Sequence, residues 1–162
     1  MASSSAVGVE KRVFDVNVLA VFLARGHPGF ESVSPVVEAG LRGAYIPLIM
    51  DVLPLRAFWI MTCRWGLPEK ECAAVIEHFV KTYDVPQYPG LRRETIVEGF
   101  RFAEELKHDV FDCIYLALAH QEKANVIVTT DTDFEKLCKH AGLAYINPVP
   151  KEVLKKFKEQ NK

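Results

Sequence analysis

Acidic side chains that could hold metal ions occur at four separate points of the chain, each where a predicted strand gives way to a predicted helix. They are Asp15, Asp51, Asp109 with Asp112, and Asp131 with Asp133. Hard divalent cations such as Mg²⁺ and Mn²⁺ take oxygen ligands and accept several carboxylates in one site. A two-metal site needs acids from different segments to converge on a volume about 4 Å across. This pattern predicts a metal site built from carboxylates.

Each of these acids also has a structural interpretation that involves no chemistry. Aspartate is a preferred N-cap, and an acid in the first helical turn is stabilised by the helix dipole. Asp109, with Asp112 three residues later, comes close to a capping box. Asp15 and Asp131 instead follow apolar strands, where parallel sheets bind their ligands. The metal interpretation rests on the whole set, because the sequence offers no nearby Ser-His-Asp set, P-loop or GxGxxG motif.

Short apolar segments alternate with helical patterns, which predicts a parallel sheet covered on both faces. The predicted strands are 11–15, 44–49, 84–88, 125–130 and 143–146. The predicted helices are 16–24, 31–42, 52–65, 69–83, 92–106, 110–122 and 134–140. Pro47 confines its strand to an edge of the sheet or shortens it. We expect one domain over residues 11–150, a flexible tail at 1–10, and a basic helix or tail at 151–162.

The composition supports one compact domain and gives no general attraction to nucleic acid. The chain has 162 residues, of which 49% are hydrophobic, and its formal net charge is −1. Binding of a polyanion therefore has to rely on local basic groups and bound metal. The sequence shows neither a signal-peptide pattern nor a membrane-spanning run, so we expect a cytoplasmic protein. The four cysteines have no zinc-site spacing and are expected to be buried free thiols: Cys63, Cys72, Cys113 and Cys138.

Three motifs together resemble the PIN-domain family of metal-dependent nucleases, most closely the VapC-like ribonucleases of toxin–antitoxin pairs. Residues 15–19 (DVNVL) resemble the family's opening D-x-N-V-L, and residues 112–119 (DCIYLALA) resemble its D-A-hydrophobic-x-L-A-x-A helix. Residues 128–134 (VTTDTDF) resemble its V-T-x-D-x-D-F segment. Their order and spacing also match, over residues 11–148. The resemblance implies a three-layer α/β/α PIN-like fold with a central parallel sheet of four or five strands.

The same resemblance implies how the site is built. Metal ligands are expected at Asp15, Asp112 and Asp131 with Asp133 in support, and the cofactor is expected to be Mg²⁺ or Mn²⁺. The family's remaining acid is usually a glutamate after the second strand. Its best match here is Asp51, which completes a catalytic set with the first three acids. Asn17 is expected to hold a metal-bound water or the substrate, and Thr130 to support the ligands. Asp109 is additional to the family pattern and is expected to cap its helix and to support the ligands from behind.

The expected activity is an endoribonuclease that hydrolyses RNA with metal-activated water, as the toxin of a VapBC-type pair. Basic residues expected to contact RNA are Arg56, Arg64, Arg92, Arg93 and Lys107. The apolar helix 52–65 suggests a homodimer or a groove for a VapB-like antitoxin, with Trp59 buried in the core or a dimer seam. Two alternatives remain. One is a catalytically idle PIN-fold module that binds RNA or protein, and the other is a haloacid-dehalogenase-like phosphatase, which Asn17 argues against because that chemistry uses D-x-D.

Overall fold

Four short strands form one parallel sheet in the computed structural model, which describes residues 8–160. The strands are β1 (Lys11–Phe14), β2 (Ile46–Leu48), β3 (Val126–Val128) and β4 (Ala144–Ile146). Their order across the sheet is β2-β1-β3-β4, and every pair is parallel. Val13 at the centre pairs with Leu48 on one side and Ile127 on the other. Most of the predicted tail at 1–10 lies outside the described residues.

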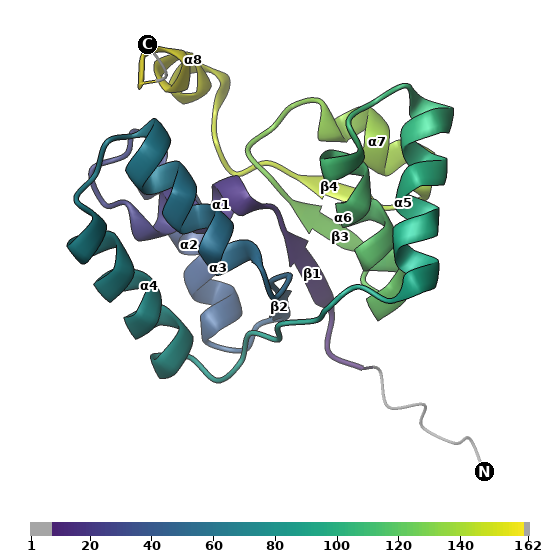
Figure 1. Ribbon diagram of the computed structural model, residues 1–162, viewed down its shortest axis with the longest axis horizontal. Helices are drawn as coiled ribbons and strands as arrows, with labels where there is room; N and C mark the ends of the chain where they lie inside the picture. The colour runs from purple at the N-terminus through teal and green to yellow at the C-terminus, as the bar shows by residue number, and fades with distance from the viewer. Residues whose placement is uncertain (1–7, 161–162) are drawn as a thin grey trace.

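Helices cover both faces of this sheet and confirm the three-layer α/β/α architecture. The helices are α1 (Val16–Leu23), α2 (Phe30–Leu41), α3 (Leu53–Trp59), the π-helix η1 (Ile60–Arg64), α4 (Glu69–Thr82), α5 (Arg93–Leu106), α6 (Val110–Glu122), α7 (Phe134–Ala141) and α8 (Lys151–Gln160). Figure 1 shows α1 to α4 grouped on one side of the sheet and α5 to α7 on the other, with α8 beyond the first group. Of the two central strands, β3 is apolar and buried throughout, and β1 is apolar and buried in its second half, at Val13 and Phe14.

The strand predicted at 84–88 is wrong, because this segment forms only a single parallel bridge, between Leu48 and Gln87. The Gln87 amide donates to the Pro47 carbonyl at 2.9 Å, and the Ile49 amide donates to the Gln87 carbonyl at 2.9 Å. Pro89 lacks the N–H that the next pair of hydrogen bonds would need, so beyond Gln87 only the bond from the Asp51 amide to the Pro89 carbonyl continues the pairing. Pro47 thus sits on the outer strand of the described sheet, as its missing donor requires.

The predicted helix 52–65 is interrupted where α3 changes into η1. The Trp65 amide donates to the Ile60 carbonyl, five residues back, at 3.1 Å. Thr62 contributes to this change, because its hydroxyl donates to the Phe58 carbonyl at 2.8 Å. Cys63 on this turn is exposed, which corrects the expectation of a buried thiol, whereas the other three cysteines are buried and free. Within residues 8–160, no helix combines the length and apolar character needed to cross a membrane.

The strand order places a topological switch point between β1 and β3. The chain leaves β1 toward β2 on one side, and later enters β3 on the other side of β1. In such sheets the crevice beyond the carboxyl ends of the two strands is the usual ligand site. The Asp15 amide donates to the Val128 carbonyl at 3.1 Å, which continues the β1–β3 pairing up to that crevice. The fold thereby brings the segments after β1 and β3 together.

The helix α2 packs closely on β2 at Gly40, and this contact gives a test of the packing. A Cβ at Gly40 would lie 2.7 Å from Pro47 Cγ and 2.8 Å from the Tyr45 ring. Because both neighbours are rigid rings, we expect Gly40→Ala to lower the free energy of unfolding by about 1–3 kcal/mol, despite alanine's better helix propensity. Urea unfolding measures this. Gly26→Ala is the control, since nothing lies within 4 Å of its added Cβ, and an equal loss there would contradict the packing argument.

Candidate active site

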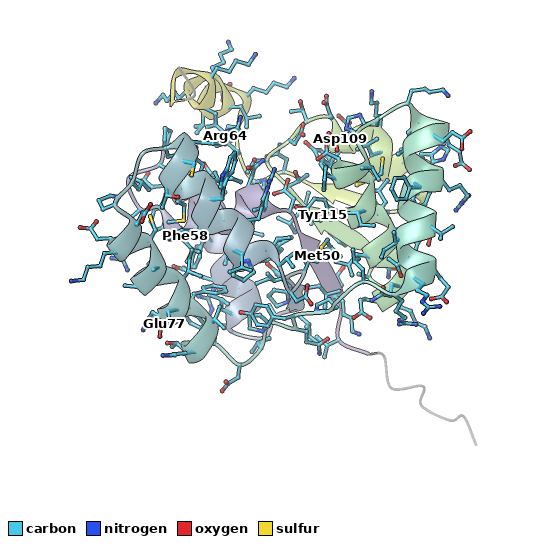
Figure 2. The ribbon with its side chains drawn as sticks, in the orientation of Figure 1. Met50, Phe58, Arg64, Glu77, Asp109 and Tyr115 are labelled. Carbon is cyan, nitrogen blue, oxygen red and sulfur yellow. The ribbon has the colours of Figure 1, made fainter. Side chains whose placement is uncertain are left out.

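A cavity of about 500 Å³ lies beyond the carboxyl ends of β1 and β3, between α3 and α6. Asp15, Asp112 and Asp131 all line it, and so do Asn17 and Arg56. Figure 2 shows Met50 and Tyr115, two other lining residues, in the region between the two helical groups. Three predicted acids from three separate segments therefore share one pocket, where the sheet topology places a ligand.

Asp15 is the most buried of these acids, with 3% of its surface exposed. It is the N-cap of α1, and its Oδ1 accepts a hydrogen bond from the Val18 amide at 3.0 Å. Burial raises the pKa of its carboxyl to about 7, and the charge of Asp131 adds to this effect. Hydrogen bonds from Thr129 and Val18 act in the opposite direction. Asp15 thus caps a helix and also lines the pocket, so its role as an N-cap is compatible with the metal-ligand role that the sequence predicts.

Thr129 links two of the acids and is the main residue that the sequence analysis missed. Its hydroxyl donates to Asp15 Oδ2 and accepts from the Asp131 amide at 3.0 Å. The predicted supporting residue was its neighbour Thr130, which instead lines a small adjoining cavity with Asn17 and Arg64. Side chains alternate in direction at the end of a strand, so a shift of one residue changes which threonine faces the acids.

Asp112 lies in the first turn of α6, on the opposite wall of the pocket. Its Oδ2 lies 2.9 Å from His108 Nε2. Burial raises the pKa of the Asp112 carboxyl, the hydrogen bond from His108 lowers it, and the charge of Asp131 raises it. The same Asp131 charge thus affects both Asp15 and Asp112, which shows that the three carboxylates are close enough to interact.

Asp131 is held by the turn that leads into α7. Its Oδ1 accepts from the Asp133 amide at 2.9 Å, and its carbonyl accepts from the Phe134 amide at 3.2 Å. Asp133 is exposed at the start of α7 and is not among the residues that line the pocket. Its clearest contact is therefore through its backbone, which orients the Asp131 carboxylate.

Asp51 lies apart from the other three acids. It is exposed and does not line the pocket, although its neighbours Met50 and Val52 do. Its amide donates to the Pro89 carbonyl at 3.1 Å, and its Oδ2 would lie 3.1 Å from a Cβ added at Gly90. Its carboxylate is thus directed toward the 89–90 loop. Of the four acids expected to converge, three line the pocket, namely Asp15, Asp112 and Asp131.

The remaining predicted residues fall into two groups. Asp109 is the N-cap of α6 and accepts from the Phe111 amide at 2.6 Å, so its capping role is confirmed. Lys107 is an exposed residue just before it. Arg92 lies at the other end of α6, where its amide donates to Gln121 Oε1 at 3.0 Å. It and Arg93, the first residue of α5, are therefore remote from the pocket.

Tyr115 is a further pocket residue that the sequence analysis did not single out. Its hydroxyl accepts from the Val16 amide at 3.2 Å, which joins α6 to the first turn of α1. Burial raises the pKa of this hydroxyl, and the charges of Asp15 and Asp112 raise it further. Tyr115 therefore stays protonated and fixes the distance between the helix that carries Asp112 and the one that Asp15 caps.

The donor set suits a hard divalent cation, although no complete cage is preformed. Its ligands are carboxylate oxygens, two of them with raised pKa values that a nearby cation would lower. Among residues 8–160, no three Asp, Glu, His or Cys side chains already stand at metal-cage spacing. Asp112 is engaged by His108 and Asp131 by the Asp133 amide. A cation bound here would compete with these partners for the carboxylate oxygens.

Comparison with known proteins confirms the resemblance to the PIN-domain family. The sequence model of the PIN domain matches residues 82–140, which contain Asp112, Asp131 and Asp133 but not Asp15. No curated protein sequence matches the chain.

Two solved structures are similar in fold. VapC20 of Mycobacterium tuberculosis, described as a sarcin–ricin loop cleaving toxin, superposes with a TM-score of 0.62 at 10% identity over 77% of this chain and 93% of its own. VapBC2 of Rickettsia felis, described as bound to a DNA fragment from its promoter, gives 0.64 at 11% identity over 85% of this chain and 98% of that chain. At such identities these likenesses establish the fold, and the three-layer PIN-like architecture is thereby shown.

The raised pKa of Asp15 predicts how stability depends on pH without metal. The carboxyl is protonated at low pH in both states, but in the folded state it must ionise against a pKa of about 7. Its favourable contribution is therefore present below about pH 4 and is lost as the pH rises through 7. We expect Asp15→Asn in EDTA to flatten this decline and to raise the free energy of unfolding at pH 8 by on the order of 1–3 kcal/mol. Urea unfolding from pH 4 to 8 measures it, and parallel curves for parent and variant would contradict it.

Proposed function

We propose that this chain, whose residues 82–140 match the PIN domain, is a metal-dependent endoribonuclease and the toxin of a VapBC-type pair. One observation carries the proposal. Three acids from separate segments, Asp15, Asp112 and Asp131, line a single pocket at the switch point of the sheet. That donor set suits Mg²⁺ or Mn²⁺, and the residue types in the pocket offer no other hydrolytic constellation.

The ligands in this proposal are Asp15, Asp112 and Asp131. Asp133 supports Asp131 through its amide, and Thr129 fixes Asp15. A divalent cation bound here would activate water and offset the charge that builds up on the phosphate during hydrolysis. Asp15 would hold such a cation in its ionised form, so its raised pKa would make cation binding favour higher pH.

The rest of the pocket positions the RNA. Arg56 lines it with an exposed guanidinium that can neutralise a phosphate oxygen. Asn17, at the start of α1, supplies an amide that donates to water or to the sugar–phosphate backbone. His108 holds Asp112 in place through its Nε2 contact. Arg64 lines the adjoining cavity and offers a second positive charge for the RNA backbone. Arg92 and Arg93 lie too far from the pocket to contact RNA bound there.

The proposed partners follow from the same function. R. felis VapBC2 is a complex of a toxin and its antitoxin, and its fold likeness supports a VapB-like partner for this chain. Homodimerisation is part of the proposal as well. Exposed apolar residues on α3 and α5 supply surface for such contacts, among them Leu55, Val97 and Phe100.

A catalytically idle PIN-fold module is the second candidate, and the position of Asp51 favours it. The fourth acid of the expected catalytic set is directed to the 89–90 loop, away from the pocket. Such a module would bind RNA or protein without cutting it. An activity measurement separates the two candidates.

We expect the purified protein to cleave mixed-sequence single-stranded RNA in Mn²⁺ or Mg²⁺ and to stop in EDTA. Asp112→Asn should lower kcat by at least roughly 100-fold, since loss of a ligand costs no less than loss of its outer partner. Asp84→Asn is a matched control, because it removes an exposed aspartate charge away from the pocket. Cleavage that survives both EDTA and Asp112→Asn would contradict the nuclease, and pure protein that never cuts RNA would favour the idle module.

Metal binding itself is tested by melting curves with EDTA and with Mn²⁺. A cation that binds only the folded protein raises Tm. We expect Asp15→Asn and Asp112→Asn to raise Tm in EDTA, by relieving charge repulsion, and to shrink the further rise on adding Mn²⁺. Asp84→Asn should keep the full Mn²⁺ shift. The same measurement on Asp51→Asn decides the role of that residue: we expect an unchanged shift, and a reduced one would restore Asp51 to the ligand set.

A further inference from the structure

Two aromatic side chains at the rim of the carboxylate pocket remain exposed and have no role in the core. Trp59 is 46% exposed and Phe111 is 75% exposed. Trp59 was expected in the core or in a dimer seam; its exposure rules out the core, and it lines the pocket that α3 borders. Large aromatic groups on a protein surface are usually kept for a partner.

These rings belong to opposite walls of the cavity that contains the three acids. Trp59 comes from α3 with Val52 and Leu55, while Phe111 comes from α6, directly before Asp112. We call the three carboxylates the floor of the cavity, and the largely apolar residues of α3 and α6 its walls. A cavity of about 500 Å³ with apolar walls and a few convergent polar groups has the size and character of a small-molecule site.

The charges around Trp59 narrow the choice of ligand. The Arg56 guanidinium lies 5.1 Å from the centre of the Trp59 ring. Arg56 and Trp59 both line the pocket, so this cation lies at its edge. An aromatic ring, a cation and the carboxylates proposed to hold a divalent metal match three features of an RNA strand: a base, a neighbouring phosphate and the phosphodiester that is cut. An acidic peptide would be repelled by the floor.

We propose that Trp59 and Phe111 form a nucleobase site, in which the base next to the scissile phosphate stacks while Arg56 pairs with a neighbouring phosphate. The inference rests on the proposed RNA substrate and specifies it. Bases inside an A-form helix are already stacked on their neighbours and cannot enter. The base that occupies this site must therefore be unstacked from its neighbours.

Binding is measured with Ca²⁺ present, using a 12-nucleotide oligouridylate and an abasic ribose-phosphate chain of the same length and charge. Base–aromatic stacking predicts that Phe111→Ala and Trp59→Ala each weaken oligouridylate binding by about 5- to 100-fold. Neither change should alter binding of the abasic chain. Val80→Ala is the control, because Val80 is 42% exposed on α4, outside the pocket and apart from the α3 and α5 surfaces proposed for protein contacts. Phe111→Tyr keeps an aromatic face and should restore the affinity.

The outcomes distinguish this inference from the nuclease itself. Stacking-dependent binding by a protein that never cleaves would uphold the base site and reject the nuclease. Cleavage with unchanged oligouridylate affinity in Trp59→Ala and Phe111→Ala would reject the base site and leave the nuclease standing. Equal losses for the oligouridylate and the abasic chain would also overturn it. So would sedimentation showing that these two changes dissociate a dimer without affecting RNA affinity, which would make the rim a contact between copies.

Discussion

The site depends on one constraint, the burial of the Asp15 carboxyl among other acids at the end of β1. Taking this carboxyl out of water raises its pKa to about 7, and the Asp131 charge opposes its ionisation further. Two donors hold it in place, the Val18 amide and the Thr129 hydroxyl. The Val18 bond is local to the start of α1, whereas the Thr129 hydroxyl comes from the end of β3, so the second bond forms only when β1 and β3 are paired. The site therefore forms only together with the sheet. The favourable packing of the sheet offsets the unfavourable burial of the acids at its edge.

Helix starts supply the second means of holding like charges together. Asp15 caps α1, Asp109 caps α6 with Asp112 in its first turn, and Asp131 precedes α7. The N-terminus of a helix carries partial positive charge from its free amides and stabilises a nearby acid. Several helices thus begin at one edge, and their dipoles lower the repulsion between the carboxylates. Capping and metal binding are accordingly not rival explanations of these residues, because the geometry that caps the helices also gathers the ligands.

The sequence predicts the parts of this molecule that depend on local pattern. The β-branched segment Val126–Val128 and the apolar face of α6 were predictable from periodicity alone, and with them the layers and the pocket edge. The direction of a side chain at the end of a strand was not, because neighbouring residues point to opposite sides. Asp51 and Thr129 both show this. Similarly, the extended segment around Gln87 has strand-like composition, but its flanking prolines allow only one bridge, which depends on a partner distant in sequence.

The pocket combines a charged floor with apolar walls, and the charge of the whole chain explains why that combination suits RNA. A formal net charge of −1 gives no long-range attraction to a polyanion. Phosphate contacts near the site are limited to residues such as Arg56 and Arg64, so electrostatics alone would hold RNA weakly and in a strongly salt-dependent way. Stacking on Trp59 and Phe111 depends little on salt and acts on any base. In the proposed base site, affinity comes from the apolar walls and reactivity from the acidic floor.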